Sequence, residues 1–423
     1  MLDIKFIREN KDLVSSGAKK KHIDFDIEKL IGVDDKRREL LTKIEAKRAE
    51  QNEVSERIVK ITDKDEKSAL IGKMQSLKAE MQKEEEELKT IMHDWQALMV
   101  AVPNIPDMSV PEGESDKDNK EIKTWGTIPT FSFEPKNHIE LMENLGMLDL
   151  ERGTKVAGFR GYFLKGDGAR LQFALWRFVQ DFFTKKENYT PMIVPSLLKR
   201  ELLLGTGYIP QGEEDLYKTQ DGEYLSGTAE VATMGYYMDE VIDKKDLPLK
   251  FLSFSDAFRR EAGSHGKDTK GILRVHEFYK YEQVVLCEAN HEESVKYHEE
   301  VQKNAEEITE ALGLPYHVVI NCGGDLGLGQ VKKYDIEVWV PSEKTYRETG
   351  SASYFHYFQT RRLNIRYKDD DGKLKFVHSL NNTALSGRPL IMIVENYQNE
   401  DGSINIPEVL QPYMNNQKII SKK

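Results

Sequence analysis

One stretch of the chain gathers side chains that could bind a phosphate, an amine and an aromatic base. Residues 258–282 read FRREAGSHGKDTKGILRVHEFYKYE. We predict that the first part ends a β-strand, so that Arg259 and Glu261 point the same way by the period of two that strands follow. Arginine can bind a phosphate or a carboxylate at two points. The pair therefore predicts a site that holds a phosphate and an amine.

The second half of this stretch is predicted to return as another strand. A basic loop over residues 263–271, which includes Lys267, separates the two strands. The return strand carries Arg274, Phe278 and Glu282, and the last two share a face because they lie four residues apart. The ring of Phe278 offers a surface on which a base can stack. We expect the two strands to face one site.

Composition limits the class of protein that can carry this site. The chain has 423 residues, which suggests two or three domains, and a formal net charge of −11, so a nucleic-acid surface must be a local patch. Two cysteines, Cys287 and Cys322, cannot build a disulfide scaffold or a cysteine-rich zinc site. The first twenty residues lack the apolar core of a signal peptide, and no apolar run is long enough to span a membrane. We expect a cytoplasmic protein.

The N-terminal part is predicted to form a long antiparallel helical hairpin. Between residues 34 and 99 there is no proline, and Gly72 is the only glycine. Apolar positions recur with the 4–3 step of a coiled coil, and residues 62–67 could form the turn at the tip. The first seam is Leu40, Ile44, Lys47, Gln51, Val54, Ile58 and Ile61, and the second is Leu70, Met74, Leu77, Met81, Glu84, Leu88, Ile91, Trp95 and Leu98.

The remainder divides into a linker and a second domain. Residues 1–104 are assigned to the arm, 105–135 to a linker rich in Pro, Asp and Glu, and 136–423 to an α+β domain. Helices are expected at 168–186 and 291–312, among short apolar runs that favour a largely antiparallel sheet. These runs are 192–194, 249–254, 283–287, 317–320, 334–340 and 390–395.

Three further features of the sequence bear on nucleotide or metal binding, and none of them predicts such a site. No GxxxxGK[ST] motif occurs. The glycine-rich residues 323–329 are expected to form a tight turn with left-handed positions. His291 and Glu292 are followed by Val295 where a zinc-protease helix needs a histidine, so no zinc site is predicted.

With these motifs in place, the chain resembles the seryl-tRNA synthetase family, bacterial type, which belongs to the class II aminoacyl-tRNA synthetases. Residues 259–264 match the second class II motif, and Pro195 matches the proline of the first motif, which in this class lies at the dimer interface. The resemblance covers essentially the whole chain. The other matches are Thr228-Ala229-Glu230, Tyr334 to Trp339, Tyr346-Arg347-Glu348, Gln359 to Arg366, Asn381-Asn382-Thr383 and Gly387-Arg388.

The resemblance implies a class II catalytic domain, built on an antiparallel sheet flanked by helices, that ligates L-serine to tRNA(Ser), and to tRNA(Sec) where present, with ATP and Mg²⁺ in a homodimer. It implies catalytic roles for Arg259, Glu348 and Arg388. It implies serine binding by Thr228, Ala229, Glu230, Arg259, Glu282, Asn381 and Thr383. It implies ATP binding by Arg259, Arg260, Glu261, Val275, Phe278, Glu348, Thr349, Gly350, Ser351 and Arg388, with Mg²⁺ at Glu348 and Ser351.

Alternatives remain open at the level of sequence. A non-catalytic RNA-binding relative would keep the fold and the arm but lose Arg259, Glu348 or Arg388, all of which are present. A relative that aminoacylates a carrier protein would lack the arm and carry a cysteine metal ligand in the pocket. The arm itself could be only a spacer between protomers. The segment between Thr383 and Arg388 is one residue shorter than is usual in the family.

Overall fold

The computed structural model describes residues 1–186, 188–263, 266 and 268–422. Ser264 of the second motif and Lys267 of the basic loop lie outside the described residues. Contacts divide the chain into two compact units. One consists of residues 2–19 and 23–103, and the other of Met1, residues 20–22 and residues 104–423. Each unit is described by itself.

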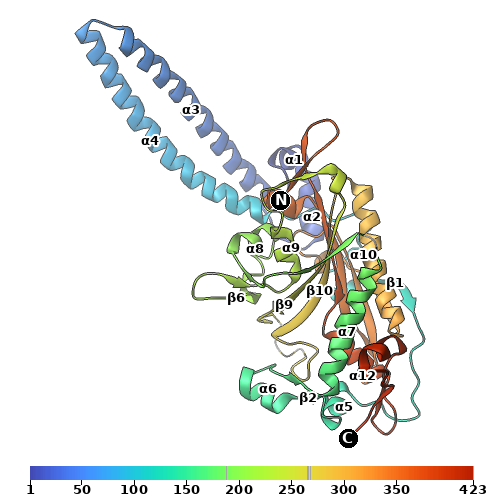
Figure 1. The fold of residues 1–423 in the computed structure, drawn as a ribbon. Helices are drawn as coiled ribbons and strands as arrows, with labels where there is room; N and C mark the ends of the chain where they lie inside the picture. Colours follow the sequence, from blue (N-terminus) through green and yellow to red (C-terminus); the bar gives the residue numbers. More distant parts are fainter. Residues whose placement is uncertain (187, 264–265, 267, 423) are drawn as a thin grey trace. The chain divides into compact units, whose positions relative to one another are not determined.

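The smaller unit is built from helices. They are α1 (Ile4–Glu9), α2 (Lys11–Lys20), α3 (Ile27–Lys60) and α4 (Lys64–Ala101). Helices α3 and α4 run antiparallel, side by side, and form the arm (Figure 1). The 34 residues of α3 span about 50 Å at the α-helical rise. The predicted hairpin is confirmed, but its tip is shorter than expected, because Asp63 already caps α4 by accepting from the N–H groups of Asp65 and Glu66.

The two predicted seams face each other along the arm. Every position of both seams is buried or half-buried, while the positions between them are mostly exposed. The polar interruptions in the seams pair with one another, because Lys47 Nζ lies 2.9 Å from a carboxylate oxygen of Glu84. An ion pair at the same height, between Arg48 and Glu85, adds a contact at the exposed edge. The polar gap in the first seam is therefore compatible with a coiled coil.

The larger unit is organised around an eight-stranded sheet. Its strands pair antiparallel, except that the edge strand β4 runs parallel to β9, and this confirms the α+β class with an antiparallel sheet. The order across the sheet is β1 (Lys120–Trp125), β11 (Tyr316–Ile320), β12 (Lys332–Val340), β13 (Thr345–His356), β16 (His378–Leu385), β10 (Glu277–Cys287), β9 (Leu249–Phe258) and β4 (Tyr189–Ile193).

Helices and small sheets surround this sheet (Figure 1). The helices are α5 (His138–Asn144), α6 (Leu150–Ala157), α7 (Asp167–Thr184), α8 (Arg200–Thr206), α9 (Ala229–Gly235), α10 (His291–Ala311), α11 (Phe358–Arg362) and α12 (Arg388–Asn396). The small strands are β2 (Leu148–Asp149), β3 (Phe163–Leu164), β5 (Leu197–Leu198), β6 (Tyr217–Lys218), β7 (Tyr224–Leu225), β8 (Val241–Asp243), β14 (Arg366–Lys368), β15 (Leu374–Phe376), β17 (Ile404–Asn405) and β18 (Ile419–Ile420). No helix among the described residues combines the length and the apolar character that crossing a membrane requires.

Three features differ from the sequence predictions. The segment predicted as a linker contributes the edge strand β1, which pairs with β11. The apolar run 390–395, predicted with the strands, lies in helix α12, because short apolar runs do not separate a buried strand from a buried helix and Pro389 favours a helical first turn. In residues 323–329 none of the glycines has a positive φ. They instead allow close packing, since a Cβ on Gly329 would meet the ring of Phe358 at 2.6 Å.

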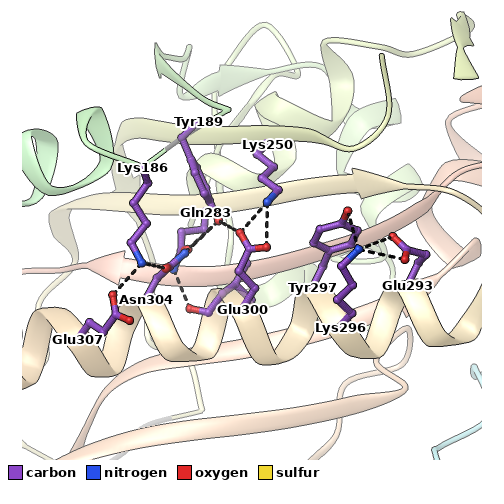
Figure 2. A network of polar contacts seen from close by, with 11 residues as sticks. Lys186, Tyr189, Lys250, Gln283, Glu293, Lys296, Tyr297, Glu300, Asn304 and Glu307 are labelled. Carbon is purple, nitrogen blue, oxygen red and sulfur yellow. Dashed lines mark hydrogen bonds and ion pairs between the residues drawn. The ribbon is translucent and has the colours of Figure 1, made fainter. Parts of the chain in front are cut away.

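Helix α10 covers one face of the sheet and is tied to it by polar contacts. Gln283 of β10 and Asn382 of β16 both donate to the carbonyl oxygen of Val301, at 3.0 and 2.6 Å. Figure 2 shows the network around Gln283: its Oε1 accepts from Asn304 Nδ2 at 2.8 Å, and Asn304 Oδ1 accepts from Lys186 Nζ at 2.7 Å. Because neighbouring strand residues point to opposite faces, Glu282 and Thr383 face away from α10.

This network predicts a measurable contribution to stability. Replacing Asn304 by alanine leaves the buried Oε1 of Gln283 without its closest partner and removes an acceptor from Lys186. We expect the free energy of unfolding to fall by about 1–3 kcal/mol. Chemical denaturation measures it, with Lys303→Ala, an exposed neighbour on the same helix, as the control. An equal loss in both variants would contradict this account of the network.

Candidate active site

A cavity of about 310 Å³ opens on the face of the sheet away from α10. Twelve of the residues predicted for the site line it, from β10, β13, β16, α9, α12 and the segment between β9 and β10. They are Glu230, Arg259, Glu261, Val275, Phe278, Glu282, Glu348, Thr349, Ser351, Asn381, Thr383 and Arg388. The lining residues all belong to the larger unit.

The floor of the cavity consists of two rows of side chains across the sheet. Directly paired strand residues point to the same face, so the register defines each row. The first row holds Ser351, Thr383 and its direct partner Glu282, and the second runs Lys333, Ser353, Asn381. The floor thus places hydroxyl and amide groups between the acidic Glu282 at one end and the basic Lys333 at the other.

A bulge in β13 explains which of its residues face the cavity. The register between β12 and β13 shifts between the Ile336 and Glu337 pairs, so Gly350 pairs with Ile336 but Glu348 pairs with Glu337. The residue skipped by the pairing, Thr349, lines the cavity together with Glu348 and Ser351, which a regular alternation would not allow. Gly350 does not line the cavity, and a Cβ there would meet Ile336 and the carbonyl of Thr383.

Arg259 lies between two parts of the site. Its guanidinium carbon is 5.3 Å from the ring centre of Phe278. Its Nε and Nη2 lie 3.4 and 3.3 Å from the carbonyl oxygen of Gly227, the residue before Thr228. The arginine therefore spans from the aromatic ring to the loop that begins α9.

The backbone around Arg259 differs from the predicted strand. β9 ends at Phe258, and Glu261 has a φ of +57°, so Arg259 and Glu261 are not on one regular strand. They line the same cavity because the chain turns there, and Glu261 is held by an ion pair with Arg274 at 2.6 Å. On the return strand the prediction is confirmed for Phe278 and Glu282, which both belong to β10 and line the cavity, but it is wrong for Arg274, which precedes the first residue of β10, Glu277.

Basic residues control the charge of Glu348. Its carboxylate lies 3.4 Å from Nη1 of Arg388, which also donates to the carbonyl of Glu348 at 2.7 Å. Burial raises the pKa of Glu348, but the positive charges of Arg388, Lys333 and Arg259 outweigh it and hold the pKa at about 2. Glu348 is therefore ionised at neutral pH, and Ser351 donates to it at 3.2 Å.

The opposite end of the floor holds two buried carboxyls whose pKa values are raised. Burial raises the pKa of Glu282 to about 7, partly offset by Lys280, whose Nζ lies 2.5 Å away. Burial also raises the pKa of Glu230, against hydrogen bonds donated by Gln359 and Tyr208 at 2.6 and 3.0 Å. These carboxyls lie where a cationic ligand would stabilise the ionised form.

Glu282 gives the site a pH dependence that can be measured. Its folded pKa of about 7 means that the carboxyl is protonated below neutrality and cannot then offer full negative charge to a bound ligand. We expect the KM for the amino-acid substrate to rise as the pH falls below about 7, by up to about tenfold per unit. Glu282→Gln should have a high KM that is flat over the same range. An unchanged slope in this variant would assign the dependence to another group.

Besides Gly350, three predicted residues are not brought into the cavity. Arg260 lies outside it and donates to the carbonyl of Glu214 at 3.1 Å. Ala229 is fully buried in the first turn of α9. Thr228 is buried too, and caps α9 by accepting from the N–H of Glu230. Thr228 and Ala229 thus place Glu230 rather than line the cavity themselves.

Several lining residues were missed by the sequence reasoning. Lys280 lies between Phe278 and Glu282, and the period of two already puts it on their face. Lys333 is the direct partner of Ser353, which lies two residues from Ser351, but the sequence does not show that pairing. Tyr208 and Gln330 lie in irregular segments, and no periodic signal marks them.

Comparisons with known proteins agree with this geometry. Residues 217–397 match the family described as "tRNA synthetase class II core domain (G, H, P, S and T)", and residues 1–106 match "Seryl-tRNA synthetase N-terminal domain". The chain is 42% identical to the serine–tRNA ligase of Deinococcus radiodurans, over 100% of this chain and 99% of that protein. The chain belongs to the seryl-tRNA synthetase family. The serine–tRNA ligase of Geobacter sulfurreducens is also 42% identical, over 98% of each chain.

Solved structures of this family have the same fold. The seryl-tRNA synthetase of Pyrococcus horikoshii, crystallised with ATP, is similar with a TM-score of 0.92 and 36% identity over 100% of both chains. The cytoplasmic serine–tRNA ligase of Naegleria fowleri, in complex with AMP, gives a TM-score of 0.88 and 32% identity over 100% of this chain and 99% of that one. As members of this family are class II synthetases, the cavity on the antiparallel sheet is the candidate active site.

Proposed function

We propose that the protein ligates L-serine to tRNA(Ser) in two steps at this cavity. The serine carboxylate attacks the α-phosphate of ATP, which forms seryl-adenylate and releases pyrophosphate. A hydroxyl of the terminal ribose of the tRNA then attacks the seryl carbonyl and releases AMP. The observation that carries the proposal is that one cavity is lined by arginines, by an ionised glutamate and by the hydroxyl and amide groups of the floor. Charging of a tRNA(Ser) transcript with labelled serine tests it, with a non-cognate transcript as the control.

The activation step needs neutralised charge and fixed positions more than a covalent nucleophile. Arg259 bridges the serine carboxylate and the α-phosphate, in keeping with its place between the α9 loop and the ring of Phe278. Phe278 stacks on the adenine, and Glu261 and Val275 border the same end. Arg388 holds the γ-phosphate end.

The amino-acid side of the cavity is assigned to the acidic end of the floor. Glu230 receives the α-amino group, since a buried carboxyl is stabilised in its ionised form by a cation. Glu282 and Thr383, which are directly paired, receive the serine hydroxyl, with Asn381 two residues along the same strand. A site that binds a hydroxyl in this way rejects alanine, because its buried polar groups would be left unpaired.

The residues at the other end suit Mg²⁺. Glu348 is ionised and Ser351 lies beside it, and both provide the hard oxygen ligands that this ion prefers. Among the described residues, no group of three or more His, Cys, Asp or Glu could hold a metal by itself. We propose that Glu348 and Ser351 hold Mg²⁺ together with the ATP phosphates, where its charge would offset that of the phosphates.

The arm is assigned to tRNA binding. Residues 36–60 of α3 hold eight lysines and arginines against five acidic residues. We propose that the arm contacts the long variable arm of tRNA(Ser), and of tRNA(Sec) where present, by shape and backbone charge more than by sequence. Residues 1–104 are then a tRNA-binding domain, and we propose a cytoplasmic location, where tRNA is charged for translation.

We propose that the protein acts as a homodimer. Edge strand β4 and helix α7 expose large apolar side chains, with Ile193 88% and Phe173 72% exposed. A hollow of about 730 Å³, lined by Phe173 and other aromatic residues, shares five residues with the candidate active site, among them Tyr162 and Phe278. An unpaired edge strand and exposed apolar patches favour association.

Light scattering tests the dimer. We expect twice the chain mass of 48.7 kDa for the unmodified protein. The double variant Ile193→Glu, Phe173→Glu should shift toward the single-chain mass, because it places four carboxylates in the apolar contact of the dimer. The control is Val59→Glu, an exposed residue of the arm. A single-chain mass for the unmodified protein at micromolar concentration would contradict the proposal.

The alternatives have less support. Arg259, Glu348 and Arg388 all line one cavity, which a non-catalytic RNA-binding relative has no need to preserve. Neither Cys287 nor Cys322 lines the cavity, whereas the carrier-protein enzymes need a cysteine ligand there.

A further inference from the structure

Serine and threonine differ by one methyl group, so discrimination between them depends on a wall close to the amino-acid side chain. Gln330, which precedes β12, lines the cavity and donates from Nε2 to Ser353 Oγ at 2.8 Å. Ser353 is the direct partner of Asn381 in the second row of the floor. Gln330 therefore lies over this row, beside the residues to which we assign the serine hydroxyl.

We propose that Gln330 is the wall that limits the amino-acid side chain and excludes the methyl group of threonine. This inference rests on the proposed function and adds to it a specificity-determining residue. One methyl group in an apolar pocket is worth only about 10–200-fold in discrimination. A larger ratio requires a wall that does not yield to the extra methyl.

The segment that carries Gln330 has the rigidity that such a wall needs. The side-chain Oε1 of Gln330 accepts from the N–H of Gly327 at 2.6 Å, so both ends of its amide are held. Lys21 Nζ donates to the carbonyls of Gly327, Leu328 and Gln330, at 3.0, 2.9 and 2.5 Å. The remaining carbonyl, of Gly329, accepts from Asn104 Nδ2 at 3.0 Å. Four consecutive carbonyl groups are therefore fixed by side chains.

Lys21 acts here as a positioning residue. It is 3% exposed, and its three hydrogen-bond acceptors are backbone oxygens of this one segment. Burial lowers the pKa of Lys21, because the charged form loses its hydration. Its role is to hold the backbone behind Gln330, and it does not line the cavity.

The test compares pyrophosphate exchange with serine and with threonine, as the ratio of the two kcat/KM values. We expect Gln330→Ala to lower the serine-to-threonine ratio at least tenfold, chiefly by raising kcat/KM for threonine. Gln172→Ala is the matched control, because this glutamine lines the same cavity from α7, beside Tyr162 and Leu164. The control should leave the ratio within twofold of the unmodified protein.

A second variant keeps the proposal testable if the first loses activity. Lys21→Met, with no donors for the three carbonyls, should lower the ratio in the same direction, by about threefold or more. A ratio unchanged in both variants, with serine exchange intact, would overturn the wall while leaving the ligase function in place. No serine exchange in the unmodified protein would contradict the proposed function itself, and the wall with it.

Discussion

Replacing Arg259 by alanine should abolish most of the serine-dependent exchange between pyrophosphate and ATP. The guanidinium is the one group that spans the ring of Phe278 and the carbonyl of Gly227, and it would bridge the reacting carboxylate and phosphate. Loss of such a contact in a water-excluded site costs about 10²–10³-fold in rate, or about 2.7–4 kcal/mol. We expect a fall of about 10³-fold in kcat/KM. Steady-state exchange kinetics measure it.

The neighbouring arginine supplies the control. Arg260 carries the same charge one residue away but lies outside the cavity, bonded to the carbonyl of Glu214. Arg260→Ala should retain exchange within about threefold. Arg259→Lys should lose nearly as much as the alanine variant, because a lysine ammonium cannot bind at two points. Equal losses in the Arg259→Ala and Arg260→Ala variants would show that positive charge near the site, rather than the geometry of Arg259, is what matters.

Shortening the arm should separate the two steps of the reaction. The cavity is lined by residues of the larger unit alone, whereas α3 and α4 belong to the smaller unit. We expect removal of residues 44–88, replaced by a short Gly-Ser turn, to leave serine-dependent exchange within about twofold. Charging of tRNA(Ser) should fall by at least about 100-fold, since backbone contacts supply much of the affinity for a nucleic acid.

The junction of this variant is chosen to keep the base of the arm. Arg37 lies over the ring of Trp95, with its guanidinium carbon 4.7 Å from the ring centre, and both residues remain. Circular dichroism and the native mass confirm folding before the kinetics are compared. If charging survived at the rate of the full-length chain, the arm would be a spacer and the tRNA contact would lie elsewhere.

The arm and the return strand show what sequence periodicity can predict. Apolar residues that recur with the 4–3 step, such as Leu77 and Met81, are the residues that two paired helices bury. The hairpin can therefore be predicted from the sequence alone. The period of two likewise predicts that Phe278 and Glu282 lie on the same face of their strand. Periodicity does not reveal which other strand a segment pairs with, so the sequence alone places the segment of β1 in a linker.

The rest of the site depends on irregular backbone. The bulge in β13 brings Glu348 to the cavity together with Ser351, and no local pattern marks a bulge of this kind. Glu261 reaches the cavity through a positive φ rather than through strand alternation. Gln330 and Tyr208 come from loops, where the position of a side chain is set by contacts distant in sequence, such as Lys21 with the segment around Gln330.

Serine-dependent exchange between pyrophosphate and ATP tests the central claim most directly, with alanine, glycine and threonine as competing substrates. The account predicts exchange with serine and little with the other three, because alanine and glycine leave Glu282 and Thr383 without a hydroxyl and threonine meets the wall at Gln330. Exchange should disappear in the Arg259→Ala variant. A well-folded protein that supports no exchange with any of the four amino acids would contradict the assignment of this cavity as the site of serine activation.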